Sequence, residues 1–208
     1  MLDLIIKNGQ CYIDGELKET DVSIKDGKIQ NIGQISEKAK DIIDAKSLTV
    51  LPGCIDTQTH FREPGSTDTE DLHSGSRAAI AGGITAVFEM PNTNPPTSNK
   101  KEFQKKLDLA KNRMHSNYAF YFGATADNAN DLASLKNLEG CCGIKLFAGS
   151  STGNLLVADE KDIEKVFQNS SKVVAVHSED EAILKINKKL IKNGNVHSHP
   201  VWRSEECA

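Results

Sequence analysis

The pattern of apolar and polar residues changes near Pro52. Before this residue, short alternating runs are separated by Asn-Gly or Asp-Gly pairs at positions 8–9, 14–15 and 26–27. Such pairs between alternating runs predict tight hairpin turns. We therefore expect residues 1–50 to form a small antiparallel sheet, part of a β-sandwich, that is too thin to bury a core by itself.

After Pro52, apolar runs alternate with longer stretches in which apolar residues recur every three or four positions, the spacing of a helix face. The expected strands lie at residues 53–56, 84–90, 118–122, 142–147 and 173–177. The expected helices lie at residues 70–82, 100–114, 130–138, 160–167 and 181–192. Alternation of strands and helices indicates parallel βαβ units, and hence an α/β fold of either the doubly wound or the (β/α)8 barrel type.

Chain length bears on the choice between these folds. A (β/α)8 barrel takes about 250 residues, whereas the whole chain has 208. Residues 203–208 begin a helical turn without a stop signal. Residues 51–208 therefore predict either an open five-stranded sheet or the first five βα units of a partial, TIM-like barrel, with residues 1–50 as a separate N-terminal β-domain.

Composition narrows the classes of function. The chain carries 25 Lys and Arg against 29 Asp and Glu, a net charge of -4, and this balance argues against a nucleic-acid-binding protein. No apolar run reaches the length of about 18 residues that a transmembrane helix needs, so we expect no membrane association. The N-terminus lacks the basic start of a signal peptide. Five cysteines without paired spacing favour a reducing, cytoplasmic location.

Polar residues cluster where the predicted strands end, which is where parallel α/β folds place their active sites. Gln58 and His60 are two residues apart and point to the same side of an extended strand, and Asp56 and Arg62 continue that alternation. Asn92 follows the second strand. Each residue taken singly is better explained as part of a solvated loop. The prediction of a site depends on several strand ends converging.

Lys145 lies within the apolar run 143–147, and a buried ammonium group is costly unless it is paired. An ion pair with an interior carboxylate would satisfy it, and so would conversion to a carbamate that bridges metal ions. The alternative is a lysine on an edge strand whose amine reaches solvent. His177 follows the apolar run 173–176 and taken alone indicates a hydrogen-bonded core histidine. Together with His60 and Lys145, it favours a metal site.

The remaining candidate residues give weaker indications of a functional site. Cys141 and Cys142 read as a small apolar pair that enters the fourth strand. Residues 149–154 could cradle an anion with backbone N–H groups, but they lack the Lys-Ser/Thr ending of a nucleotide-binding loop, so we interpret them only as a loop near the site. The other histidines are expected at the surface: His73, His115, His197 and His199.

Four segments carry motifs in a recognisable order. Residues 52–65 read PGCIDTQTHFREPG and residues 90–93 read MPNT. Residues 143–154 contain GIKLF and GSSTGN, and residues 176–179 read VHSE. The first segment resembles the signature PG-x-ID-x-H-x-H-x-REPG of dihydroorotases, which belong to the amidohydrolase superfamily. The other three resemble the family's second landmark, its carboxylated-lysine segment and its strand-five histidine, so the resemblance spans essentially the whole chain.

This resemblance implies a zinc-dependent cyclic amidohydrolase of pyrimidine biosynthesis that interconverts N-carbamoyl-L-aspartate and L-dihydroorotate, a small-molecule substrate. It implies two zinc ions per site that polarise the carbonyl group and supply the nucleophile. Carried over by motif, His60 and His177 are metal ligands and Lys145, as a carbamate, bridges the two metals. His60, Arg62 and Asn92 contact the substrate, Arg62 through its planar fork.

The chain departs from the family pattern in two places. Gln58 stands where the family has the first histidine of the H-x-H pair, and a neutral amide is a poor substitute for imidazole at zinc. The family's later histidine and its strand-eight aspartate, the proton shuttle, have no counterpart in the 208 residues. The sequence thus resembles a C-terminally truncated dihydroorotase without its catalytic aspartate, and we expect little or no activity.

Three functions remain open at this point. The first is an active or once-active dihydroorotase. The second is another cyclic amidohydrolase, which Arg62 disfavours because hydantoinase-like relatives lack this arginine and allantoinase-like relatives carry a different residue. The third is a non-catalytic, dihydroorotase-like remnant or structural partner. For such a chain we expect association with itself, as a homo-oligomer, or with another pyrimidine enzyme.

Overall fold

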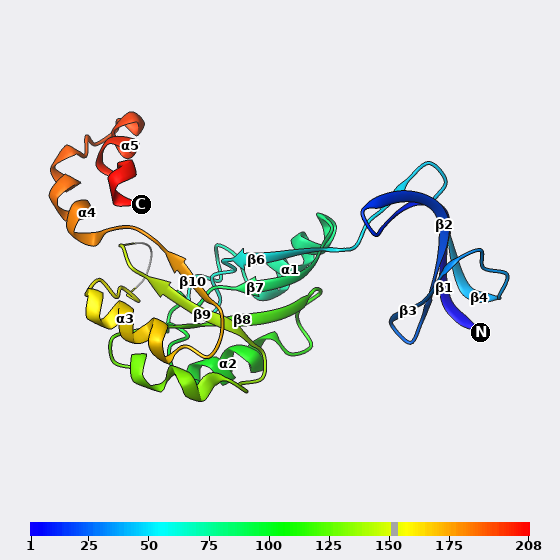
Figure 1. Cartoon of the computed structure of the whole chain (residues 1–208), viewed down its shortest axis with the longest axis horizontal. Coiled ribbons are helices and arrows are strands. Elements are labelled where there is room, and N and C mark those ends of the chain that lie inside the picture. The colour runs from blue at the N-terminus through cyan, green and yellow to red at the C-terminus, as the bar shows by residue number, and fades with distance from the viewer. Residues whose placement is uncertain (151–153) are drawn as a thin grey trace. The chain divides into compact units, whose positions relative to one another are not determined.

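The computed structural model describes residues 1–150 and 154–208, and these form two compact units, Met1–Gly53 and Cys54–Ala208 (Figure 1). Each unit contains one five-stranded sheet. The middle of the loop at 149–154, which the sequence suggested as an anion cradle, lies outside the described residues.

The N-terminal unit is a mixed sheet rather than the antiparallel sheet expected. Strands β1, β2 and β3 pair antiparallel in the order β3-β2-β1, whereas β4 and β5 both run parallel to β1. No strand was expected at β4. The strands are β1 Leu2–Ile13, β2 Glu16–Lys25, β3 Lys28–Gly33, β4 Ala39–Asp44 and β5 Thr49–Val50.

Two of the three predicted hairpin turns are confirmed. Ile13 pairs with Glu16 across Asp14-Gly15, and Lys25 pairs with Lys28 across Asp26-Gly27. The turn residues have positive φ angles, at 51° and 88° in the first turn and 52° and 72° in the second. Asn, Asp and Gly tolerate this conformation best, which is why these pairs predict two-residue hairpins.

The prediction of a turn at Asn8-Gly9 is wrong. Strand β1 continues through this pair with a register shift between Ile6 and Gly9. A Cβ atom at position 9 would lie 2.6 Å from Val50 Cγ2. Glycine is therefore needed here for the close approach of β5 rather than for a turn.

The core of the N-terminal unit contains few residues, as expected for a sheet too thin to bury a core by itself. Leu2, Ile5 and Ile35 form its buried apolar cluster. Several large apolar side chains on its strands stay exposed, among them Leu17, Ile29 and Ile42.

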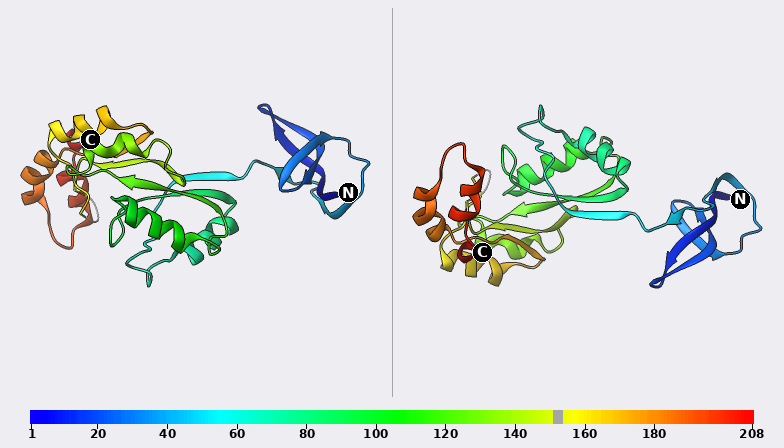
Figure 2. Two further views of the ribbon diagram at one scale, coloured as in Figure 1. Left: turned by 90° about the horizontal axis from the view of Figure 1, so that it is seen from below. Right: turned by 90° about the horizontal axis from the view of Figure 1, so that it is seen from above.

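The second unit is built on a curled parallel sheet (Figure 2). Its order is β10-β9-β8-β7-β6, so each strand pairs with the strand that follows it in sequence. This order differs from the doubly wound fold, in which the strand order reverses at a switch point, and matches that of a (β/α)8 barrel. The strands are β6 Cys54–Thr59, β7 Ile84–Glu89, β8 Asn117–Gly123, β9 Cys141–Phe147 and β10 Val174–His177.

Helical segments connect the parallel strands, close to the predicted ranges. The stretch at 130–138 forms a 3-10 helix rather than an α-helix, and the last predicted helix ends early, at Asn187. The longer elements are α1 Leu72–Ala81, α2 Lys100–Ala110, η1 Ala129–Leu135, α3 Glu160–Asn169 and α4 Glu181–Asn187. The short elements that follow are η2 Lys188–Leu190, η3 Val196–Ser198, α5 His199–Trp202 and η4 Glu205–Cys207. None of the helices described has the length and apolar character needed to cross a membrane.

The four α-helices that follow strands begin at side chains that accept hydrogen bonds from the first turn. The capping residues are Asp71, Asn99, Asp159 and Asp180. Asp and Asn stabilise a helix N-terminus because their oxygen atoms satisfy N–H groups that have no partner within the helix.

The main core lies between the parallel sheet and its helices. Phe103 of α2 contacts Phe120 of β8 edge to face, with ring centroids 6.4 Å apart. From β9, Ile144 and Leu146 enter the same apolar cluster. Because side chains alternate along a strand, Lys145, which lies between them, points to the opposite face of the sheet.

We expect Phe103→Ala to lower the free energy of unfolding of the second unit by about 3–5 kcal/mol, because it opens a cavity beside Phe120. The control is Phe167→Ala, since Phe167 is 51% exposed, and its effect should stay within about 0.5 kcal/mol. Urea denaturation followed by the fluorescence of Trp202, the single tryptophan, measures both. Equal effects of the two substitutions would contradict this placement of the core.

Candidate active site at the strand ends

His60, which follows β6, lies close to several positively charged side chains. Burial of its ring is the main cause that lowers the pKa of His60, and the charge of Arg62 lowers it further. Lys145 and Lys106 add smaller contributions in the same direction, while a hydrogen bond with Asn92 raises the pKa. The structure thus brings predicted site residues of three strand regions within electrostatic reach of one another. A surplus of cations favours an anionic ligand.

Lys145 is buried, with 2% of its surface exposed. This excludes the interpretation as a solvent-reaching lysine. Its Nζ lies 4.9 Å from the centroid of the Phe147 ring, and burial lowers the pKa of the amine. Within the described residues, no carboxylate pairs with it. Of the two explanations proposed from the sequence for a buried lysine, an interior ion pair is therefore also excluded.

His177 ends β10 next to this lysine. It pairs in register with Phe147, and Ala175 pairs with Lys145, so His177 and Lys145 lie on one face of two neighbouring strands. The Nε2 atom of His177 is 2.6 Å from Oε2 of Glu179. This contact is the hydrogen bond that the core-histidine interpretation expects.

Glu179 also accepts a hydrogen bond from Arg203, whose other nitrogen donates to the Ser150 carbonyl at 2.8 Å. Burial alone would raise the pKa of Glu179, but the bonds from Arg203 and His177 outweigh it and lower the pKa. Glu179 is therefore held as an anion that orients the His177 ring.

Gln58 is exposed, and its backbone N–H donates to Asp56 Oδ1 at 2.9 Å. A register shift in β6 between Asp56 and Thr59 breaks the alternation that the sequence predicted from Asp56 onward. Thr59 is buried, so Gln58 and His60 on either side of it still share one side of the strand. Asp56 does not belong to that set.

A buried ion pair that was not expected from the sequence lies near His60. Glu89 at the end of β7 pairs with Lys106 of α2, and their side chains are 1% and 0% exposed. Lys106 Nζ also donates to the Met90 carbonyl at 2.9 Å. Burial raises the pKa of Glu89 to about 7, although Lys106 opposes this. Lys106 follows Phe103 by three residues, so the apolar spacing of α2 already placed this lysine on its buried face.

A second ion pair holds the loop after β6. Arg113 Nη1 and Nη2 donate to Glu63 at 2.8 and 3.2 Å, and the Leu72 backbone N–H donates to the same carboxylate at 2.8 Å. The hydrogen bond that Arg113 donates to Glu63 is the main cause that raises the pKa of Arg113. Glu63 is 6% exposed, so the carboxylate of this pair is shielded from solvent.

The unmodified side chains do not complete a metal site. No group of three or more His, Cys, Asp or Glu residues with suitable geometry occurs in the described part of the chain. His60 and His177 offer imidazole nitrogens, and Gln58 offers only an amide. A third anionic ligand would have to come from Lys145 as a carbamate, so the residues fit a metal only in that modified form.

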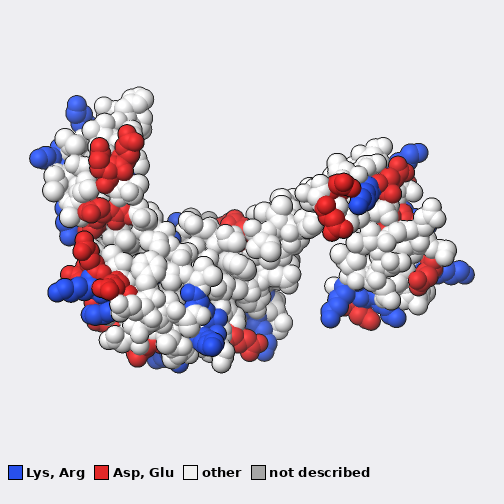
Figure 3. Space-filling model, viewed as in Figure 1, with Lys and Arg blue, Asp and Glu red and all other residues white. Residues whose placement is uncertain are grey.

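The other candidates lie where the sequence suggested. The four histidines expected at the surface are exposed; two of them, His73 and His115, have ring centroids 4.7 Å apart. All five thiols are free, and burial raises the pKa of Cys142 to about 12. Lys and Arg side chains intermingle with Asp and Glu over the face shown in Figure 3.

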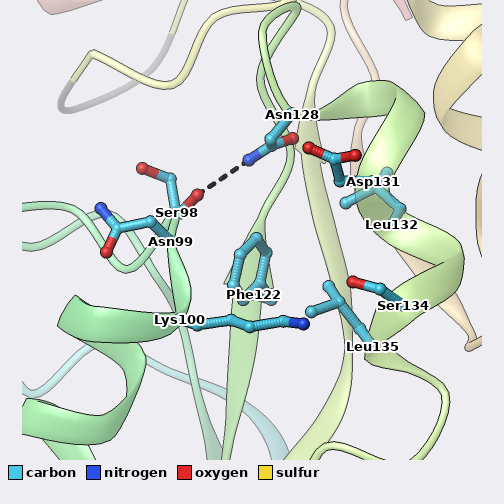
Figure 4. Close-up of a pocket in the computed structure, with 9 residues that line it drawn as sticks. All are labelled: Ser98, Asn99, Lys100, Phe122, Asn128, Asp131, Leu132, Ser134 and Leu135. Carbon is cyan, nitrogen blue, oxygen red and sulfur yellow. Dashed lines mark hydrogen bonds between the residues drawn. The ribbon is translucent and has the colours of Figure 1, made fainter.

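A separate pocket of about 380 Å³ opens beside the first turn of α2. Phe122 and Leu132 lie among its lining residues, and Asn128 Nδ2 donates to the Ser98 carbonyl at 2.9 Å across one side (Figure 4). It contains none of the predicted site residues. The remaining lining residues are Asn99, Lys100, Asp131, Ser134 and Leu135.

Comparison with known proteins identifies the family. The model of the amidohydrolase family matches residues 49–206. The chain belongs to the amidohydrolase family. This confirms the superfamily inferred from the motifs at 52–65 and 143–154.

The similar proteins differ in the activity that their names give. Over 207 residues, the chain is 35% identical to an allantoinase of Escherichia coli O1:K1 / APEC, covering 95% of this chain and 46% of the relative. Over 197 residues, it is 36% identical to a dihydroorotase of Methanosarcina mazei, covering 92% and 43%. The L-hydantoinase structure from Arthrobacter aurescens has a TM-score of 0.87 at 27% identity, covering 100% of this chain and 49% of that one. The chain spans about half the length of these amidohydrolases.

We expect the buried Glu89 to make stability fall as pH rises. Its pKa is about 7 in the folded protein against an ordinary value of 4.5, so between these values the folded state binds more protons than the unfolded state. The free energy of unfolding therefore decreases from pH 4.5 to about 7 through this group. Glu89→Gln removes this titration and should flatten the slope.

Urea denaturation at several pH values measures this slope. Glu102→Gln is the control, since it breaks an ion pair with Lys105, which is 55% exposed. An unchanged slope in Glu89→Gln would show that Glu89 keeps an ordinary pKa.

Proposed function

We propose that this chain supplies one half of the active site of a zinc-dependent cyclic amidohydrolase of the dihydroorotase type, acting on N-carbamoyl-L-aspartate and L-dihydroorotate. Residues 51–208 would form the first five βα units of a (β/α)8 barrel, and residues 1–50 part of a β-sandwich domain. The observation that carries the proposal is Lys145, a buried amine that has no carboxylate partner among the described residues and lies within electrostatic reach of His60.

The environment of Lys145 suits carbamate formation. Burial lowers the pKa of the amine, so a larger fraction is neutral and nucleophilic than in a solvated lysine. When the nitrogen adds to carbon dioxide, an N–C bond forms, one N–H proton leaves to solvent, and the product is an anion. The charge of Arg62, which acts on the neighbouring His60, favours an anion in this region.

A carbamate on Lys145 would complete a donor set for zinc with His60 and His177. Imidazole nitrogen and anionic oxygen are ligands that zinc accepts. The bound metal would polarise the substrate carbonyl and lower the pKa of water. Glu179, hydrogen-bonded to Nε2 of His177 in the structure, would have to yield that nitrogen or leave the other one to the metal.

Arg62 and Asn92 suit the substrate's carboxylate groups. A guanidinium group binds a carboxylate through two parallel hydrogen bonds. Asn92 is 8% exposed and bonds with His60, so it fixes the imidazole next to the place where the carboxylate would lie. An acidic substrate is what distinguishes the dihydroorotase type, and this supports it over hydantoinase-like and allantoinase-like functions.

Gln58 favours a second candidate, a non-catalytic chain that associates with itself or with another pyrimidine enzyme. Its amide stands where the family signature has imidazole, and this weakens any metal site. In the described residues, β6 and β10 each have a neighbouring strand on one side only. Unpaired strand edges of this kind favour association with other chains.

We expect Lys145 to take up carbon dioxide. Protein equilibrated with 13C-labelled bicarbonate should show one carbamate carbon signal in its NMR spectrum, and Lys145→Met should lose it. Lys165→Met is the control, because Lys165 is exposed and paired with Asp162 at 2.8 Å. If the signal is absent from the wild-type protein, or persists in Lys145→Met, the assignment of Lys145 is wrong.

We expect Gln58→His to bind zinc more tightly than wild type, by roughly tenfold, a change of the size that groups around metal ligands produce. Gln30→His, which places a histidine on the exposed surface of β3, should have no such effect. Ring closure of N-carbamoyl-L-aspartate with added zinc should stay far below a typical enzyme rate of ~10 per second in both variants and in wild type. Turnover near that rate in wild type would refute the expected impairment, and absence of zinc binding in all forms would favour the non-catalytic candidate.

A further inference from the structure

The two ion pairs described above lie beside the residues that precede and follow Arg62. The proposed function assigns Arg62 to the substrate carboxylate. We infer that Glu89–Lys106 and Glu63–Arg113 position Arg62 by holding the backbone on both sides of it. The inference rests on the proposed function for the role of Arg62, whereas the positioning itself concerns only the folded chain.

The residue before Arg62 is held by the first pair. The backbone N–H of Phe61 faces the Glu89 carboxylate and lowers its pKa. That carboxylate is oriented by Lys106, which is itself tied to the Met90 carbonyl. Glu89 and Lys106 are both fully enclosed, so water does not compete for these bonds.

The residue after Arg62 is held by the second pair. The Glu63 carboxylate accepts both Arg113 nitrogens and also the backbone N–H of Leu72, the first residue of α1. Both cations therefore come from one region, Lys106 within α2 and Arg113 shortly after it, while the carboxylates come from β7 and the loop after β6. The helix that follows β7 thus fixes the loop that leaves β6.

Arg62 needs such support because its backbone is in the left-handed region, with φ at 61°. Non-glycine residues with a side chain of this size adopt that conformation only where the surrounding structure imposes it. In an unrestrained loop, Arg62 would return to negative φ and its side chain would take another direction. With both flanking residues anchored, the guanidinium group stays near His60, on whose pKa its charge acts.

A role in positioning can be separated from a role in stability. Replacing both members of a buried ion pair by apolar residues often preserves stability, whereas removing one member leaves an unpaired buried charge. The test variant is therefore the double substitution Glu89→Leu with Lys106→Met. The matched control is Glu102→Leu with Lys105→Met, which removes an ion pair of the same helix whose lysine is 55% exposed.

Two NMR measurements on the wild-type protein and its variants report on the backbone without metal or substrate. The intra-residue HN–Hα nuclear Overhauser effect of Arg62 is strongest when φ is positive, and we expect it to weaken in the test variant and not in the control. Exchange of the Phe61 amide proton should accelerate about tenfold when the carboxylate that it faces is removed. Glu89→Gln retains an oxygen acceptor and should keep the Arg62 signal.

The inference is overturned if the folded test variant keeps the Arg62 effect and the slow Phe61 exchange. Where that variant does not fold, Arg113→Met releases the second pair instead, since Arg113 is 37% exposed; the Arg62 effect should weaken there too, and its retention would overturn the inference. Binding of N-carbamoyl-L-aspartate should weaken about tenfold in whichever of these two variants folds, consistent with a displaced charged donor. If the wild-type protein does not bind this compound, the proposed function fails, while the NMR result still decides the positioning.

Discussion

Strand alternation in the parallel sheet buries the amine of Lys145 where no carboxylate in the described part of the chain pairs with it. Ile144 and Leu146 must face the helices, because their side chains complete the core against Phe103 and Phe120. The residue between them is forced to the other face, and that residue is Lys145. A buried lysine without a carboxylate is an unstable electrostatic arrangement unless its charge is lost or an anion is added. The chemistry we propose for the site follows from this packing.

The balance of charges around the strand ends also favours an anion at the site. Glu89 and Glu63 are each paired with a cation, so neither contributes a free negative charge to the site. Lys145 and Arg62 remain as cations that act on His60. The surplus is positive, and either a carbamate on Lys145 or the carboxylate of a substrate would balance it. Carboxylates in this region orient backbone and cations, which leaves the ligand to supply the anion.

Membership of the amidohydrolase family does not by itself assign a substrate, since the relatives include allantoinase, dihydroorotase and hydantoinase proteins. Two residues of this chain bear on the question in opposite directions. Arg62 favours an acidic substrate in the proposed function, and its φ of 61° is one that few non-glycine residues adopt. Gln58 would weaken the metal site that we propose beside it. In the proposed function, the chain would therefore combine a supported place for the substrate with a weakened place for the metal.

Local patterns in the sequence were sufficient for the five parallel strands and the α-helices between them in the second unit, the hairpins at 14–15 and 26–27, and the family, but not for the 3-10 helix at Ala129–Leu135 or the early end of α4. Each depends on residues near one another in the chain, such as an Asp-Gly pair or an apolar residue every three or four positions. The turn predicted at Asn8-Gly9 failed because Gly9 serves the close approach of Val50, which comes from a distant strand. β4 was missed for a related reason, since its pairing with β1 is parallel and long-range.

For the site, the sequence identified His60, Arg62, Asn92, Lys145 and His177 as candidates, because polar residues at strand ends and within apolar runs are visible locally. Only the tertiary structure decided what each one has as a partner. It showed that Lys145 has no carboxylate beside it among the residues described and that Lys106 is paired with Glu89. Such partners come from separate elements, and their burial depends on how helices pack on the sheet, so no local pattern specifies the charges that surround each group.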